Sequence, residues 1–243
     1  MALRVLAIAF GLIICLPGHY LWRLLRAHSP WPRLFLGWVG RCAGARVEIV
    51  GTPHRSHVLI VANHASWLDI MVIAHATGAA FVSKQEVRRW PLAGWLADLN
   101  NTVYVERAAR GAVHGQADAL RTALASGRPI ALFPEGTTDG GMSVLPFRAS
   151  LFAAIVPPLD NIVVQPVAID YGSAGADIAW VGGETTIANV RRLLSRPGTF
   201  KVALRFLEPI DPHALPDRKA LAKASHDAIV QSLGASAWCH HIL

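Results

Sequence analysis

The sequence predicts an α/β domain with a mixed, largely parallel central sheet flanked by helices, preceded by an N-terminal hydrophobic helical anchor. From about residue 45 onward, short β-branched runs alternate with longer amphipathic stretches, as strands and helices do in such a domain. Apolar residues occupy 53% of the 243 positions and charged residues only 16%, which excludes a disordered chain. Because the composition does not change after residue 45, we expect residues 1–44 to form a membrane-associating helical segment and residues 45–243 to form one domain.

The N-terminal segment combines apolar runs with aromatic residues. Val5–Leu16 is apolar and Tyr20–Leu25 continues it, but Pro17 interrupts the two runs, so neither is a comfortable membrane span. No small-residue cleavage site follows the first run, which argues against a signal peptide. We expect a helical anchor that is either inserted in the membrane or interfacial, although a helix that packs on its own domain fits the same pattern. Three tryptophans would then lie near the lipid headgroups: Trp22, Trp31 and Trp38.

Beyond the anchor, the expected elements follow the period of the apolar positions and end at turn residues. The helix Ser66–Thr77, for example, ends at Gly78. Strands are expected at Arg46–Val50, Val58–Ala62, Ala80–Ser83, Thr102–Val105, Ile130–Phe133, Ile162–Asp170 and Phe200–Leu207. The other helices are expected at Gly111–Ser126, Thr186–Leu194 and Pro216–Leu233. One strand contains Pro166, which lacks a ladder donor and predicts a sheet edge, a bulge or a strand end.

The stretch Asn63–Asp69, with the sequence NHASWLD, carries the clearest chemical pattern. It follows a predicted strand and opens a predicted helix, where α/β proteins place catalytic groups. His64 lies in the loop, Ser66 is a candidate helix N-cap, and Asp69 in the first turn can reach back to the imidazole. A carboxylate beside a histidine fixes its tautomer and stabilises its protonated form, as a general base requires. This pattern therefore predicts catalysis by His64 and Asp69.

Two further stretches follow predicted strands. The sequence FPEGT places Glu135 directly after a proline, Gly136 where a backbone can approach a ligand, and Thr137 as a hydroxyl donor. Arg107 follows another strand, and arginine is suited to bidentate binding of phosphate or carboxylate. Each signal is weak alone, because glycine-rich turns and surface arginines are common. The order of these stretches along the chain is more specific than any one of them.

That order, NHxSxxD, an arginine at a strand end, FPEGT and a proline-bearing strand, resembles the glycerolipid acyltransferase family that includes 1-acylglycerol-3-phosphate acyltransferase. The resemblance covers about residues 45–210. It implies transfer of a fatty acyl group from an acyl thioester, on acyl carrier protein or coenzyme A, to a lysolipid hydroxyl, without a metal or another cofactor. It makes His64 the general base and Asp69 its orienting partner. Support of the loop and acceptor binding would fall to Asn63, Ser66, Arg107, Glu135, Gly136, Thr137 and Arg148.

The sequence departs from the family pattern at Thr138, where many members have an arginine after FPEGT. The longer string Phe133–Gly141 and the following Val144–Arg148 are similar to relatives that acylate lyso-ornithine lipid. Arg148 could replace the missing cation, so 1-acylglycerol-3-phosphate stays open as an acceptor. Either reaction belongs to the biosynthesis of membrane lipids, including phospholipids.

The chain is basic, with 23 Lys and Arg against 16 Asp and Glu. These cations are scattered and no zinc-finger spacing exists, so anionic membrane lipid is the expected partner and nucleic acid is not. Cys15, Cys42 and Cys239 form no CxxC pair, and no HExxH spacing indicates a metal hydrolase. We expect the enzyme at the inner (cytoplasmic) membrane, with its domain facing the cytoplasm. A non-catalytic membrane-binding protein with the same fold is the alternative, but it leaves the pairing of His64 with Asp69 unexplained.

Overall fold

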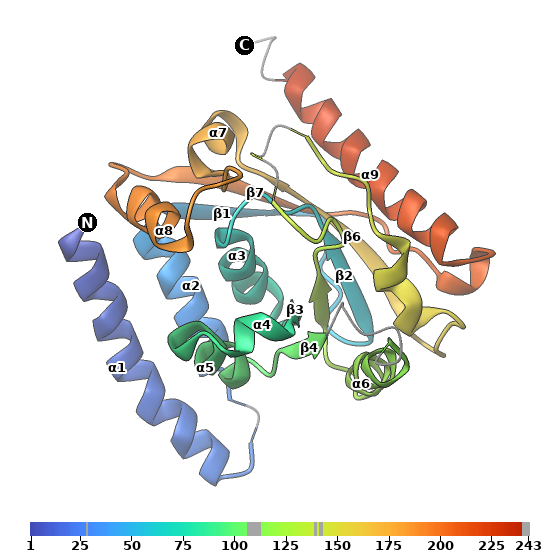
Figure 1. Ribbon diagram of the computed structural model, residues 1–243, viewed down its shortest axis with the longest axis horizontal. Helices are drawn as coiled ribbons and strands as arrows, with labels where there is room; N and C mark the ends of the chain where they lie inside the picture. Colours follow the sequence, from blue (N-terminus) through green and yellow to red (C-terminus); the bar gives the residue numbers. More distant parts are fainter. Residues whose placement is uncertain (28, 106–112, 139, 141–142, 240–243) are drawn as a thin grey trace.

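The computed structural model describes residues 1–27, 29–105, 113–138, 140 and 143–239 (Figure 1). In this part of the chain a seven-stranded sheet has the order β1-β7-β6-β2-β5-β3-β4. Its neighbouring strands are parallel, apart from the antiparallel pair β6 and β7. The strands are β1 (Ala45–Val50), β2 (Val58–Ala62), β3 (Ala80–Lys84), β4 (Val103–Val105), β5 (Ile130–Leu132), β6 (Val163–Asp170) and β7 (Phe200–Phe206). The predicted fold class is confirmed.

Helices cover both faces of the sheet (Figure 1). The helices on one face are α2 (Trp31–Ala43), α3 (Leu68–Thr77) and α8 (Thr186–Ser195). The elements on the other face are α6 (Val113–Ala125), the 3-10 helix η1 (Ala149–Ile155) and α9 (Arg218–Cys239). All five residues of β2 are buried between these layers. Since a strand buried on both faces reads as a continuous apolar run, the sequence Val58–Ala62 is explained by its central position.

The predicted elements lie within a few residues of the observed ones, with one change that concerns the site. The helix α3 begins at Leu68, with Trp67 at its N-cap position, so Ser66 is not the N-cap. The Ser66 hydroxyl instead accepts a long 3.4 Å bond from the Leu68 amide. Several short helices were not predicted: α4 (Gln85–Arg88), α5 (Pro91–Leu99), α7 (Gly175–Ile178), and the 3-10 helices η1, η2 (Gly172–Ala174) and η3 (Pro212–Ala214).

Pro166 lies inside the sheet, because β6 is flanked by β2 and β7. It pairs with Val61 of β2, and its carbonyl accepts a 3.0 Å bond from the Leu207 amide on the other side. Leu207 comes just after the end of β7 at Phe206. The N–H and C=O of a strand residue point to the same side, so the missing donor faces the place where β7 has ended. The predicted sheet edge is therefore wrong. The sheet accommodates Pro166 because this residue lies beside the end of the neighbouring strand β7.

The helix α1 (Ala2–Leu24) runs without a break through Pro17, so the predicted interruption is wrong. It packs against α2, and two glycines permit this close approach. A Cβ on Gly11 would lie 2.3 Å from the Trp38 ring, and one on Gly18 would lie 2.3 Å from the Trp31 ring. Tertiary packing of this kind can hold a helix together where proline removes one backbone bond.

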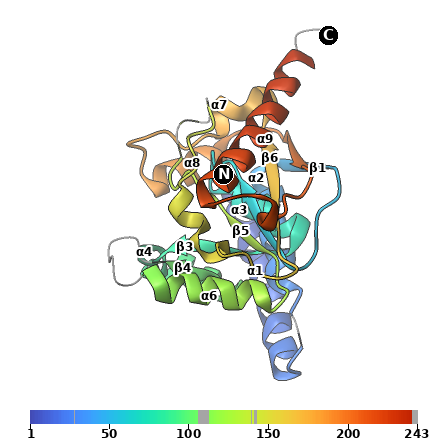
Figure 2. The same ribbon diagram turned by 90° about the vertical axis from the view of Figure 1, so that its right-hand side faces the viewer.

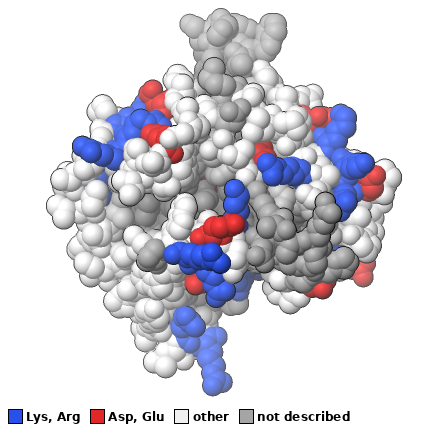
Figure 3. Space-filling model, in the orientation of Figure 1, with Lys and Arg blue, Asp and Glu red and all other residues white. Residues whose placement is uncertain are grey.

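The outer side of α1 is apolar and exposed. The helix is long and apolar enough to cross a membrane, with a mean hydropathy of 1.9 over a window that is only 11% buried. Its lower end projects beyond the α/β body in both ribbon views (Figures 1 and 2). The corresponding ridge at the lower left of Figure 3 is mostly uncharged and ends in basic side chains. The helix therefore has the length and surface of a membrane anchor, as well as a packing face toward α2.

Candidate active site

The candidate site lies where the parallel strands β2, β5 and β6 end. Asn63 follows β2, and its side chain is bonded in both directions to the backbone of Ile169 in β6. The two distances are 3.0 Å to the Ile169 carbonyl and 2.8 Å from the Ile169 amide. Asn63 is thus buried and clamps β2 to β6, which fixes the start of the following loop. This is a supporting position and brings no side-chain atom of Asn63 to a ligand.

His64 and Asp69 form the hydrogen bond that their spacing predicts. His64 Nδ1 lies 2.8 Å from Asp69 Oδ2, and the same oxygen accepts from the amides of Ala65 and Ser66 at 2.7 and 2.8 Å. Because this oxygen can only accept, the contact with His64 assigns the tautomer of the imidazole that carries its proton on Nδ1. The other imidazole nitrogen, Nε2, is then an unprotonated base, and the His64 side chain is 20% exposed while Asp69 is fully buried.

Tyr171 completes the environment of Asp69, and sequence analysis missed it. Its hydroxyl donates a 2.6 Å bond to Asp69 Oδ1, so both carboxylate oxygens are occupied. Burial and the adjacent Asp69 carboxylate raise the pKa of Tyr171 well above its usual value, which keeps this donor protonated. Tyr171 directly follows β6. Its position at the end of a strand could have identified it, because catalytic groups in α/β proteins lie at such ends, and His64 was predicted on that ground.

The FPEGT segment holds the backbone and the ring of His64. The Glu135 carboxylate is buried and accepts from the His64 amide at 2.7 Å and from the Leu145 amide at 3.0 Å. Burial raises the pKa of Glu135, while these two bonds oppose the rise. The Phe133 ring stacks on the imidazole with centroids 4.2 Å apart and planes 17° apart. Glu135 therefore has a structural role in orienting the histidine loop.

A second polar network braces the same loop from α8 and the segment before it. The Trp67 indole donates to Asn189 Oδ1 at 3.0 Å, and Asn189 donates to Glu184 Oε2 at 2.6 Å. The Trp180 amide donates to the carbonyl of Ala65 at 2.8 Å. Since Ala65 and Trp67 flank Ser66, this network fixes the chain between His64 and Asp69.

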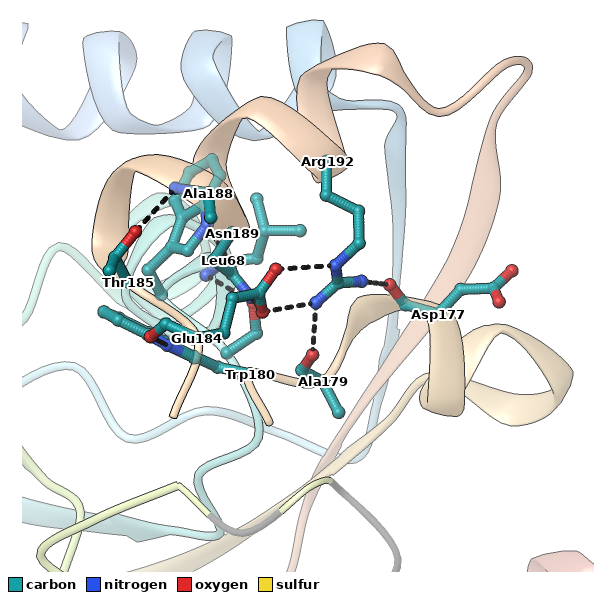
Figure 4. A network of polar contacts seen from close by, with 11 residues as sticks. Leu68, Asp177, Ala179, Trp180, Glu184, Thr185, Ala188, Asn189 and Arg192 are labelled. Atoms are coloured by element: carbon teal, nitrogen blue, oxygen red, sulfur yellow. Dashed lines mark hydrogen bonds and ion pairs between the residues drawn. The ribbon is translucent and has the colours of Figure 1, made fainter. Parts of the chain in front are cut away.

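Arg192 anchors this network (Figure 4). Its guanidinium binds both carboxylate oxygens of Glu184 at 2.9 Å and also donates to the carbonyls of Asp177 and Ala179. The bonds from Arg192 and Asn189 lower the pKa of Glu184 to about 2, so the pair stays charged near neutral pH. A bidentate arginine–carboxylate pair is directional, which suits a bracing role.

The remaining predicted residues are exposed near the FPEGT turn, buried in the loop after β2, or outside the described residues. Thr137 is exposed at the turn after Glu135, where Gly136 adopts a φ of +74°. Arg148 is exposed, and its amide donates a 3.0 Å bond to the Pro134 carbonyl, which brings it beside the FPEGT turn. Ser66 is fully buried and faces its own loop. Arg107 lies outside the described residues. Within the part of the chain that is described, no cluster of three or more His, Cys, Asp or Glu could hold a metal ion.

Comparisons with known proteins identify the family of the chain. Residues 46–170 match the acyltransferase family. A lyso-ornithine lipid O-acyltransferase of Brucella abortus is 36% identical over 233 residues, 88% of this chain and 86% of the relative. A 1-acyl-sn-glycerol-3-phosphate acyltransferase of Neisseria gonorrhoeae is 35% identical over 124 residues, 49% of each chain. The solved acyltransferase of Thermotoga maritima that acts on 1-acyl-sn-glycerophosphate shares the fold, with a TM-score of 0.65 at 24% identity over 96% of this chain and 95% of that one. The chain therefore belongs to the acyltransferase family and is an enzyme of acyl transfer.

Proposed function

We propose that this enzyme transfers a fatty acyl group from an acyl thioester to the hydroxyl of a lysolipid, with His64 as general base. The observation that carries the proposal is the 2.8 Å bond between His64 Nδ1 and Asp69 Oδ2, which leaves Nε2 available as a base. Both oxygens of Asp69 accept further hydrogen bonds, from two backbone amides and from Tyr171, so the carboxylate is held in the position that orients the imidazole. A base of this kind serves proton removal from a neutral hydroxyl.

The proposed reaction needs no covalent acyl-enzyme. Nε2 of His64 takes the proton of the lysolipid hydroxyl as its oxygen attacks the thioester carbonyl. The tetrahedral intermediate then expels the thiolate, which receives that proton from the imidazolium, so the products are an ester and a free thiol. During this step Asp69 stabilises the imidazolium, and Phe133 and Glu135 keep the ring in place.

Lyso-ornithine lipid is the acceptor that we favour. The relative with that name is 36% identical over 88% of this chain, whereas relatives named for 1-acyl-sn-glycerol-3-phosphate are 35% identical over only 49% of the chain or 26% identical over 95% of it. Thr138 also supplies no charge where a cation would meet a phosphate. The second candidate acceptor is 1-acylglycerol-3-phosphate, which is favoured by one observation, the exposed Arg148 beside the FPEGT turn.

We also propose that the enzyme works at the inner membrane with its site on the cytoplasmic side. The exposed apolar face of α1 supports membrane attachment, and the basic side chains at its end suit anionic lipid. A lysolipid acceptor lies in the bilayer, while acyl carrier protein and coenzyme A are soluble donors. No resident metal or cofactor takes part in this proposal.

The acceptor is tested by giving the purified enzyme lyso-ornithine lipid and 1-acylglycerol-3-phosphate in parallel, with acyl carrier protein and coenzyme A thioesters as donors. We expect kcat/KM for lyso-ornithine lipid to be at least about tenfold higher, a difference of roughly 1.4 kcal/mol. Efficient use of 1-acylglycerol-3-phosphate alone would overturn the assignment. In that case Arg148→Gln should raise the KM for the phosphate acceptor, while Arg218→Gln, at the exposed start of α9, serves as the matched control.

A further inference from the structure

Four arginines line one groove between α2, α3 and β1. Arg33 and Arg41 come from α2, Arg46 comes from β1, and Arg55 comes from the loop that follows β1. The groove is open to solvent and has an empty volume of about 820 Å³. No aspartate or glutamate is among its lining residues. It therefore concentrates positive charge at one place on a surface that is otherwise low in charge.

These arginines are not neutralised by carboxylates of the described residues. Each observed ion pair in that part of the chain involves other cations. Arg33 donates to the His75 carbonyl at 2.7 Å and Arg55 to the Ala76 carbonyl at 3.5 Å, both at the C-terminal end of α3. These two contacts offset the partial negative charge of the helix end, which would otherwise repel an anion. Arg41 and Arg46 are exposed, and neither is bonded to the end of α3, although Arg46 donates a 3.3 Å bond to the neighbouring Ala45 carbonyl.

The side chain of His75 lies in the electrostatic field of these arginines. It lines the groove, and its Nδ1 is buried without a hydrogen-bond partner, against Gly37 of α2. Burial lowers the pKa of His75, and the charges of Arg41 and Arg33 lower it further. A histidine kept neutral beside several arginines is expected where no anion balances them.

We propose that this groove, which we call the arginine groove, binds a phosphate group at a site separate from the catalytic one. Four guanidinium groups suit a multiply charged phosphate better than a single carboxylate, because each can donate two parallel bonds. The groove runs along α3 from Met71 to Ala76, and His75 at its C-terminal part lies six residues after Asp69, about 9 Å along the helix axis at 1.5 Å per residue. The phosphate comes either from a phospholipid headgroup or from a soluble phosphate ester.

The test uses the full chain with Arg41→Gln and Arg46→Gln combined, which leaves the contacts of Arg33 and Arg55 to α3 intact. The matched control is Arg218→Gln with Lys219→Gln, which removes the same charge from exposed residues of α9 on the other side of the sheet. One arm measures binding of inorganic pyrophosphate by calorimetric titration at fixed ionic strength. The other arm compares binding to phosphatidylcholine vesicles with and without phosphatidylglycerol.

We expect the groove variant to lose at least about tenfold in affinity for a phosphate probe, because two charge-assisted contacts are removed, while the control variant binds as the wild type does. Loss confined to the anionic vesicles identifies a lipid headgroup as the source, and loss confined to pyrophosphate identifies a soluble ester. The proposal is overturned if the groove variant and the control bind both probes equally well. Acylation catalysed through His64 should persist in the groove variant, so this outcome is independent of the proposed function.

Discussion

Replacing His64 with alanine is expected to lower the rate of acyl transfer by roughly 10²–10⁴-fold, the usual contribution of a positioned general base. The imidazole is the basic group held by Asp69. The measurement is the initial rate of thiol release with saturating donor and lysolipid. The substitution leaves α1, the proposed membrane anchor, unchanged, so binding to lipid vesicles should be the same as for the wild type.

The fold should survive this substitution. The alanine variant loses the stacking of His64 on Phe133, worth about 0.5–1.5 kcal/mol, while Asp69 keeps its bonds from the Ala65 and Ser66 amides and from Tyr171. A thermal unfolding curve close to that of the wild type is therefore the required control. His213→Ala, at an exposed position in η3, is the matched histidine variant and should keep full activity. Wild-type turnover by His64→Ala would show that the assignment of the base is wrong.

Replacing Asp69 with asparagine is expected to lower the same rate by roughly 10²–10⁴-fold while keeping the folded structure. The side-chain oxygen of the asparagine should take the position of Oδ2, because three donors surround that position. The side-chain NH₂ of the asparagine then points toward the Tyr171 oxygen, which can accept a hydrogen bond. The histidine then keeps its tautomer but loses the negative charge that stabilises the imidazolium. The loss should therefore appear in kcat, with little change in KM.

Comparison with Asp69→Ala separates the effect of losing the carboxylate charge from the effect of losing its buried hydrogen bonds. Alanine leaves the Tyr171 hydroxyl and two backbone amides without acceptors in a buried site, and each unsatisfied group costs about 1–3 kcal/mol. The alanine variant should consequently unfold at a clearly lower temperature than the asparagine variant. If asparagine instead lowered stability as much as alanine and left kcat unchanged, Asp69 would have only a structural role.

The local pattern of the sequence was sufficient to predict the strands, most helices and the pair His64 and Asp69. The apolar runs differ clearly in period, and the helical spacing between the two residues requires no knowledge of distant contacts. FPEGT predicted Glu135 at the same site for acceptor binding, and that role stays a prediction, while the structure shows a supporting contact. Glu135 holds the His64 amide from inside the protein, since its carboxylate is buried with both oxygens bonded to backbone.

The parts that sequence analysis missed depend on contacts between distant positions. Tyr171 reaches Asp69 across 102 positions, and Trp67 reaches Asn189 across 122. The continuity of α1 through Pro17 likewise depends on the fit of Trp31 against Gly18, which local propensity does not contain. Propensity predicts a break at proline, and tertiary packing overrides it.

The central claim is that His64 activates the acceptor hydroxyl for direct transfer of the acyl group. Mixing the wild-type enzyme with a radiolabelled acyl thioester, with and without lysolipid, tests it most directly. We predict that labelled ester forms only when lysolipid is present. No label should be found on the denatured protein at any time. Label bound covalently to the protein before lysolipid is added, and passed on to it afterwards, would contradict the account.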